Sequence, residues 1–197
     1  RGAWMHTIGQ MQYSEQTTEQ NKAYIRDQFD KLQKAGVNAV LFQVRPSADA
    51  FYPSKYEPWS KYLTKDGKAP SPYWDPLAFV IEEAHNRGME LHAWLNPYRV
   101  TTGKTDVPAP GHIYHKHPER FVRYADGKIY FDPALPENRE FIAKVVMDIV
   151  DNYDVDGIHF DDYFYPYPVA GKDFPDAKSY AKYGKGKNKG NWRRHNV

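Results

Sequence analysis

Two adjacent carboxylates follow a short apolar run near the C-terminal end of the chain. The run Gly157–Phe160 is typical of a buried β-strand, and Asp161 and Asp162 come directly after it. Because side chains alternate along a strand, His159 and Asp161 share one face. Cleavage of a glycosidic bond needs two carboxyl groups, one as general acid and one as nucleophile or base. The arrangement therefore predicts carboxylate chemistry, and the alternative is that the two Asp residues only cap the next helix.

Polar side chains also end a second apolar run, residues 37–44. Gln43 and Arg45 are two positions apart and so share a face of the expected strand. Burying such groups without partners is costly. The pair therefore predicts one of two arrangements, an internal hydrogen-bond network or a pair of substrate-binding residues.

A third strand-like run, residues 90–95, continues into polar and aromatic residues. His92, Trp94 and Asn96 share a face, which places Asn96 at the end of the strand. Arg99 is expected to orient a carboxylate of the site. Counting all the strand ends, we expect the substrate-binding residues to be His6, Gln43, Arg45, Trp94, Asn96, Tyr98, Arg99, His159, Tyr163 and Tyr165.

Three amphipathic helices separate the strand-like runs. The first begins at Thr17, where Gln20 has the spacing of a capping box. The second begins at Asp75–Pro76, with Asp as N-cap and Pro at the first helical position, and the third begins near Pro136. With an opening strand over residues 2–8, the order is β-α-β-α-β-α-β. Runs that are apolar on both faces are typical of a parallel sheet covered by helices.

The connections between these elements differ in length. Links from helix to strand take a few residues, whereas links from strand to helix run over residues 46–74 and 97–135. Long loops inside a compact domain are usually functional. In a β/α barrel the strand-to-helix loops form the C-terminal face, where active sites are found. The loop lengths therefore predict which end of the fold carries the chemistry.

The chain supplies four of the eight β/α units that close a barrel. We therefore predict that residues 1–197 are the N-terminal portion of one (β/α)8 TIM-type barrel catalytic domain, with a flexible loop at residues 171–191 and the start of a further helix in the last six residues. A doubly wound sheet is the alternative, but the nucleotide-binding glycine pattern is missing after the first strand. Half a barrel exposes sheet edges, so we expect self-association or a longer chain.

Composition excludes several other classes of function. The chain has 27 basic and 25 acidic residues, which gives no basis for nucleic-acid binding. It has no Cys, and no apolar run approaches the roughly 20 residues of a transmembrane segment. It begins within a strand, so we expect a leader to have been removed. His112, His115 and His117 have metal-like spacing but no obvious carboxylate partner, and we predict neither a metal nor a cofactor.

Five blocks of sequence occur in a defined order: RGAW at residues 1–4, GVNAVLFQVRP at 36–46, AWLNPYR at 93–99, YFDP at 130–133 and DGIHFDDYFYP at 156–166. Together they resemble the glycosyl-hydrolase-like family ten of bacterial barrel proteins. The resemblance implies a (β/α)8 barrel, an exported protein that is often a lipoprotein, and hydrolysis of glycosidic bonds. The resemblance also implies, as a substrate, peptidoglycan glycan strands stripped of their stem peptides.

The last of these blocks is also similar to the fourth strand of alpha-amylase-type barrels. There the Asp two residues after an inward-facing Arg is the nucleophile, which corresponds to Asp161, although His159 stands in the place of that Arg. The resemblance implies that the partner acid is either Asp162 or a residue beyond this chain.

These observations predict a glycoside hydrolase that cleaves a bacterial cell-wall or related polysaccharide, with Asp161 as nucleophile or base and Asp162 as a second carboxylate. We expect it to act outside the cytoplasm, in the periplasm, on the cell surface or after secretion, on a polysaccharide or oligosaccharide, and we expect the piece alone to be inactive. The alternative is a carbohydrate-binding barrel without turnover. A second carboxyl group within about 5–9.5 Å of Asp161 favours the enzyme over the binding protein.

Overall fold

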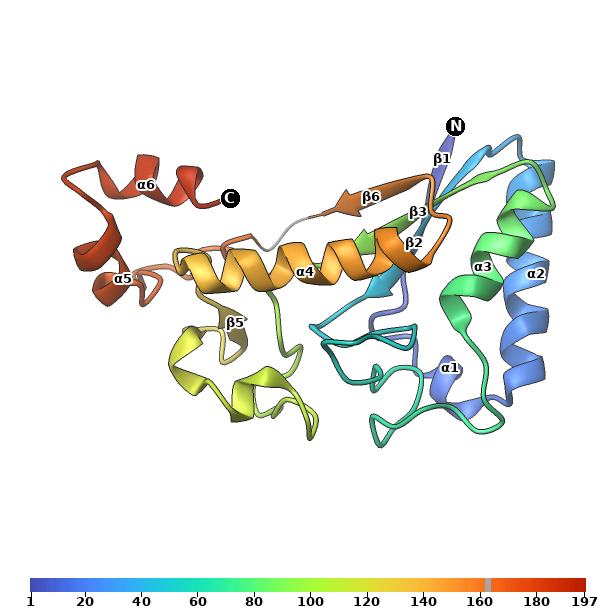
Figure 1. The fold of residues 1–197 in the computed structure, drawn as a ribbon, viewed down its shortest axis with the longest axis horizontal. Coiled ribbons are helices and arrows are strands. Elements are labelled where there is room, and N and C mark those ends of the chain that lie inside the picture. The colour runs from blue at the N-terminus through green and yellow to red at the C-terminus, as the bar shows by residue number, and fades with distance from the viewer. Residues whose placement is uncertain (162–163) are drawn as a thin grey trace.

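The computed structural model describes residues 1–161 and 164–197, and Asp162 and Tyr163 lie outside the described residues. Its main feature is a parallel sheet of four strands (Figure 1), in the order β1 (Gly2–Met5), β2 (Ala39–Arg45), β3 (Glu90–Leu95) and β6 (Gly157–Phe160). Strands that follow one another in this order are neighbours in the sheet, which confirms the predicted succession of β/α units. β1 is shorter than the expected run over residues 2–8.

Three long helices connect these strands, and local signals in the sequence fix where they begin. α2 (Thr18–Lys34) follows a complete capping box between Thr17 and Gln20, as predicted. α3 (Pro76–His85) is capped by the Asp75 side chain, and α4 (Pro136–Asn152) also has Pro at its first position. A single turn, α1 (Gln12–Glu15), precedes α2. Within the described ranges, no helix combines the length and the apolar character needed to cross a membrane.

The sheet separates a packed face from an open one. Alternate side chains of β2 and β3 point toward the helices and are fully buried, as expected for strands under a helical layer: Val40, Phe42, Val44, Leu91, Ala93 and Leu95. Ile25 and Phe29 of α2 and Val80 of α3 belong to the same core. The opposite face carries Trp4, Leu41, Trp94 and His159 in neighbouring registers, and Trp4 is 64% exposed. In a closed barrel this second face is the interior.

The long connection between β3 and α4 has a small structure of its own. It contains two single-turn 3-10 helices, η1 (Ile113–His115) and η2 (Pro118–Arg120), and an antiparallel pair formed by β4 (Phe121–Arg123) and β5 (Ile129–Phe131). The rings of Phe121 and Phe131 are 4.5 Å apart, and Phe131 stacks on Phe141 of α4 at 5.7 Å. Ring packing of this kind holds the connection against α4.

The C-terminal segment differs from the loop expected at residues 171–191. The structure forms α5 (Ala177–Tyr183) there and begins α6 (Lys189–His195), which lie at the end of the molecule opposite α2 and α3 (Figure 1). The buried Asp176 carboxylate binds the Arg193 guanidinium through two hydrogen bonds of 2.7 and 2.8 Å, and Trp192 packs on Tyr180. These contacts connect residues more than ten positions apart, so the local Gly/Lys-rich composition does not reveal them. The helix predicted for the last six residues is confirmed, although it starts three residues earlier.

Candidate active site

The structure brings together Asn96 and Asp161, two of the predicted site residues. Leu95 and Phe160 are partners in the parallel register of β3 and β6, so the residues that follow them are neighbours at the C-terminal edge of the sheet. The Asn96 Nδ2 group donates to both carboxylate oxygens of Asp161, at 3.0 and 3.2 Å. Asn96 is fully buried, whereas Asp161 is partly exposed. The Asp161 carboxylate is therefore bound by the Asn96 amide and remains partly accessible to solvent.

Arg45 lies beneath this pair, with no exposed surface. Its Nε and Nη2 groups donate to the two carboxylate oxygens of Glu57, both at 2.6 Å, and Nη1 donates to the backbone carbonyls of Asn96 at 2.5 Å and Pro97 at 2.9 Å. Burial acts to lower the pKa of Arg45, but the Glu57 charge and hydrogen bonds outweigh it and the pKa is raised. Of the two predicted arrangements, the structure shows the internal network for Arg45.

The Gln43 side chain also forms hydrogen bonds with the backbone. Its side-chain Oε1 accepts hydrogen bonds from the backbone N–H groups of Thr7 and Ile8, both at 2.9 Å, and the Thr7 hydroxyl donates to the Gln43 carbonyl at 2.9 Å. The side chain thus takes the place of ladder hydrogen bonds after Met5, where β1 stops, within the strand expected over residues 2–8. His6, at this turn, contacts Gln10 at 2.6 Å and is exposed.

Aromatic rings line the open face below Asp161. Trp94 and His159 are register partners with ring centroids 6.2 Å apart. The Trp4 indole N–H donates to His159 Nε2 at 3.1 Å, so in neutral His159 the proton is on Nδ1. The prediction that His159 and Asp161 share a face with Trp94 agrees with this geometry.

Two predicted binding residues, Tyr98 and Tyr165, lie elsewhere, whereas Arg99 contacts the residue that follows β2. Tyr98 is buried beside α4, where it lines an apolar hollow with Ile142 and Phe160 on the helix-facing side of the sheet. The Tyr165 hydroxyl accepts a hydrogen bond from the Asn196 side chain at 3.0 Å, within the C-terminal segment. The Arg99 Nη2 group donates to the Pro46 carbonyl at 3.2 Å. The structure thus gathers Trp94, Asn96, His159 and Asp161 on one face, whereas Tyr98 and Tyr165 belong to other contacts.

Glu57 was not predicted as a site residue. A fully buried arginine requires a carboxylate close by. This requirement is the one signal in the sequence that could have pointed to Glu57. The loop after Arg45 contains several candidates, among them Asp49, Glu57 and Asp66, and spacing along a loop does not distinguish them. In the structure Asp49 accepts backbone N–H groups of Ser47 and Lys61 instead, and burial raises its pKa.

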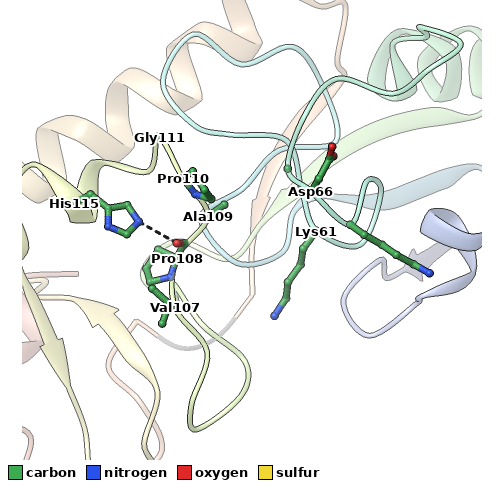
Figure 2. A pocket seen from close by; sticks show the side chains of 10 residues that line it. Lys61, Asp66, Val107, Pro108, Ala109, Pro110, Gly111 and His115 are labelled. Atoms are coloured by element: carbon green, nitrogen blue, oxygen red, sulfur yellow. Dashed lines mark hydrogen bonds between the residues drawn. The ribbon is translucent and has the colours of Figure 1, made fainter.

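A separate cleft of about 870 Å³ lies between the two long loops (Figure 2). Pro108, Ala109 and Pro110 form one wall, and Lys61 and Asp66 belong to the other. Its polar groups are already engaged: the Lys61 ammonium is 2.7 Å from Asp106, and His115 Nε2 is 3.0 Å from the Pro108 carbonyl. The cleft shares no lining residue with the Asn96–Asp161 pair.

The three spaced histidines have separate partners. His112 is buried and its Nδ1 accepts the Tyr114 N–H, His115 faces Pro108, and His117 contacts Glu119. Within residues 1–161 and 164–197, no three His, Cys, Asp or Glu side chains form a group suited to a metal ion.

Burial lowers the pKa of His112 to about 4. Its pKa in the unfolded chain is near 6.5, so between these values the unfolded state binds a proton that the native state does not. We therefore expect stability to be complete above about pH 6.5 and to fall by up to ~3 kcal/mol as the pH drops to 4. Urea unfolding at pH 7 and pH 5 measures this. In the His112→Asn variant, which has no imidazole to titrate, the unfolding free energy should differ less between pH 7 and pH 5. The control variant His117→Asn changes an exposed histidine and should keep the wild-type difference.

The fold and the open face define a class: a succession of β/α units of the barrel type, with a carboxylate after the C-terminal end of the fourth strand of the parallel sheet. The sequence matches the family described as Glycosyl hydrolase-like 10 over residues 1–197, and the chain belongs to that family.

Named relatives agree with this assignment. The chain is 50% identical over 184 residues to glycosyl hydrolase YngK of Bacillus subtilis (strain 168), and 36% identical over 220 residues to glycosyl hydrolase DigH of Escherichia coli (strain K12). These alignments cover 91% and 100% of the chain, but 35% and 49% of the two relatives, so the chain spans about half of their length or less. The solved structure of alpha-L-fucosidase isoenzyme 2 from Paenibacillus thiaminolyticus has the same fold, with a TM-score of 0.55 at 17% identity over 93% of this chain and 26% of that one.

Proposed function

We propose that the protein is a glycoside hydrolase in which Asp161 acts as nucleophile or general base. The observation that carries the proposal is the contact between Asn96 and Asp161. Asp161 follows the C-terminal end of β6 and is partly exposed, and the buried Asn96 amide donates to both oxygens of its carboxylate. In β/α barrels this is where catalytic residues stand. Either role uses the carboxylate, whose two oxygens both accept from the Asn96 amide.

The second carboxylate that glycosidic cleavage needs is Asp162 in this proposal, or a residue outside this chain. Trp94 and His159 offer apolar ring surface on the face that leads to Asp161. Such rings suit the C–H faces of a sugar. No cofactor enters the proposed chemistry, because two carboxyl groups are sufficient for it.

The proposed substrate is a bacterial cell-wall or related polysaccharide, specifically peptidoglycan glycan strands that lack stem peptides, met outside the cytoplasm. The support for this substrate is the order of sequence blocks shared with family ten, together with membership of that family. Stem peptides are bulky and charged, so a site that rejects them needs only a steric limit near the cleaved bond.

Sugar release from peptidoglycan strands, with and without stem peptides, tests the function directly. We expect the full-length protein to which this chain belongs to release oligosaccharides from the stripped strands and at least ~10-fold less from the peptide-bearing ones. Equal release from both would contradict the substrate assignment. Binding of stripped strands without any release would favour a carbohydrate-binding protein instead.

A further inference from the structure

We propose that Glu57 is a positioning residue, which holds Arg45 so that the Asn96 amide stays aimed at Asp161. Its role in turnover rests on the proposed function, but the positioning itself does not. Glu57 lies in the loop after β2, and its carboxylate contacts neither Asp161 nor the open face directly: it binds Arg45 through two hydrogen bonds of 2.6 Å, and both side chains are fully buried.

The backbone at Asn96 is held on both sides by Arg45. The Asn96 N–H donates to the Arg45 carbonyl at 2.9 Å, and the Arg45 Nη1 group donates to the Asn96 and Pro97 carbonyls at 2.5 and 2.9 Å. Asn96 is the first residue after β3: its N–H still follows the strand ladder, but its carbonyl accepts from the Arg45 guanidinium instead of from a strand. The guanidinium therefore replaces the ladder at the position from which the amide projects.

Arg45 can perform this task only in a defined orientation. A guanidinium is planar, so two hydrogen bonds to one carboxylate fix its rotation and direct Nη1 at a single place. Glu57 supplies both bonds. Without that fork, the arginine is free to turn, and the two carbonyls of Asn96 and Pro97 lose their donor.

The Asn96 amide in turn determines the orientation of the Asp161 carboxylate. Asn96 Nδ2 spans both carboxylate oxygens at 3.0 and 3.2 Å, a geometry that a small rotation about the Asn96 backbone would break. Displacement of a reacting group by about 1 Å costs on the order of 100-fold in rate. The sequence of contacts from Glu57 through Arg45 and Asn96 to Asp161 thus links a loop residue to the reacting carboxylate.

Glu57→Asp is the variant of choice, because it keeps the buried charge that balances Arg45 and shortens only the reach. In the full-length protein, we expect kcat on stripped glycan strands to fall roughly 10- to 100-fold, with KM changed less than about threefold. In an Asn96→Ala background, the same Glu57→Asp change should alter kcat by less than about twofold, because the amide through which it acts is gone.

A second readout requires no turnover. The side-chain amide of Asn96 is assigned in ¹H–¹⁵N spectra by its disappearance in Asn96→Ala. In the wild type its signals should respond to pH as Asp161 ionises, and in Glu57→Asp they should shift toward those of a solvent-exposed Asn and lose most of that response. Altered amide signals without turnover in any form would uphold the positioning role while the proposed hydrolysis fails.

Glu83→Asp is the matched control, because Glu83, like Glu57, pairs with arginine, here with Arg26 and Arg87, but away from the site where α2 and α3 pack. It should leave both kcat and the Asn96 amide signals unchanged. The proposal is overturned if Glu57→Asp leaves the amide signals as in the wild type. Equal losses of kcat in the wild-type and Asn96→Ala backgrounds would overturn it as well, since they would mean a general structural effect.

Discussion

In the full-length protein, replacing Asp161 by asparagine is expected to reduce turnover of glycan strands by roughly a thousandfold or more. The substitution keeps the shape of the side chain but removes the charge that attacks the anomeric carbon or activates water, and loss of a reacting group costs at least this much in comparable enzymes. The Asn96 amide would then face another amide instead of a carboxylate. Initial rates of reducing-sugar release, measured at saturating substrate, provide the test.

Asp156→Asn is the matched control for this change. Asp156 precedes the same strand, β6, at the opposite end of the sheet, where its carboxylate accepts the Leu91 N–H and contacts His85, both at 2.8 Å. We expect the Asp156 variant to keep its kcat, although it should unfold more easily. If Asp161→Asn also retained full turnover in a folded protein, Asp161 would be neither nucleophile nor base, and the proposed mechanism would be wrong.

The parts of the fold that sequence predicted are those that local signals determine. Thr17 with Gln20 and Asp75 with Pro76 satisfy backbone groups within one turn, so they mark the starts of α2 and α3 wherever these helices lie. The helix α5 and the start of α6 were missed because the segment that contains them is held by partners distant in sequence. Asp176 and Arg193 are seventeen positions apart, and the glycines and lysines between them suggest a loop.

At the candidate site, too, the sequence predicted what local patterns determine and missed contacts between distant residues. Alternation along a strand correctly placed Asn96 and Asp161 on one face, because the strands are regular up to the preceding residue. Tyr98 lies beyond the strand end and turns toward α4, which alternation does not describe. Glu57 comes from a loop, and its role depends on a three-dimensional contact with Arg45. Periodicity therefore predicts residues on strands, whereas their supporting partners in loops require coordinates.

The Arg45–Glu57 pair also carries the largest expected effect on stability. Arg45→Met leaves the Glu57 carboxylate buried without a counter-charge, and removal of one partner of a buried ion pair typically costs about 3–5 kcal/mol. The carbonyls of Asn96 and Pro97 lose their donor in the same step, which adds to the loss. Urea unfolding at pH 7 gives the change in unfolding free energy from the shift in midpoint at constant slope.

Two further variants test whether the unpaired Glu57 charge causes this loss of unfolding free energy. Arg26→Met removes an arginine from an exposed pair with Glu83 and should cost less than about 1 kcal/mol. The double variant Arg45→Met, Glu57→Leu removes both buried charges, and we expect it to be more stable than Arg45→Met alone. It should remain less stable than the wild type, because the Asn96 and Pro97 carbonyls still lack a donor. If the double variant were no more stable than the single one, the lost hydrogen bonds, and not the unpaired Glu57 charge, would dominate the loss of stability.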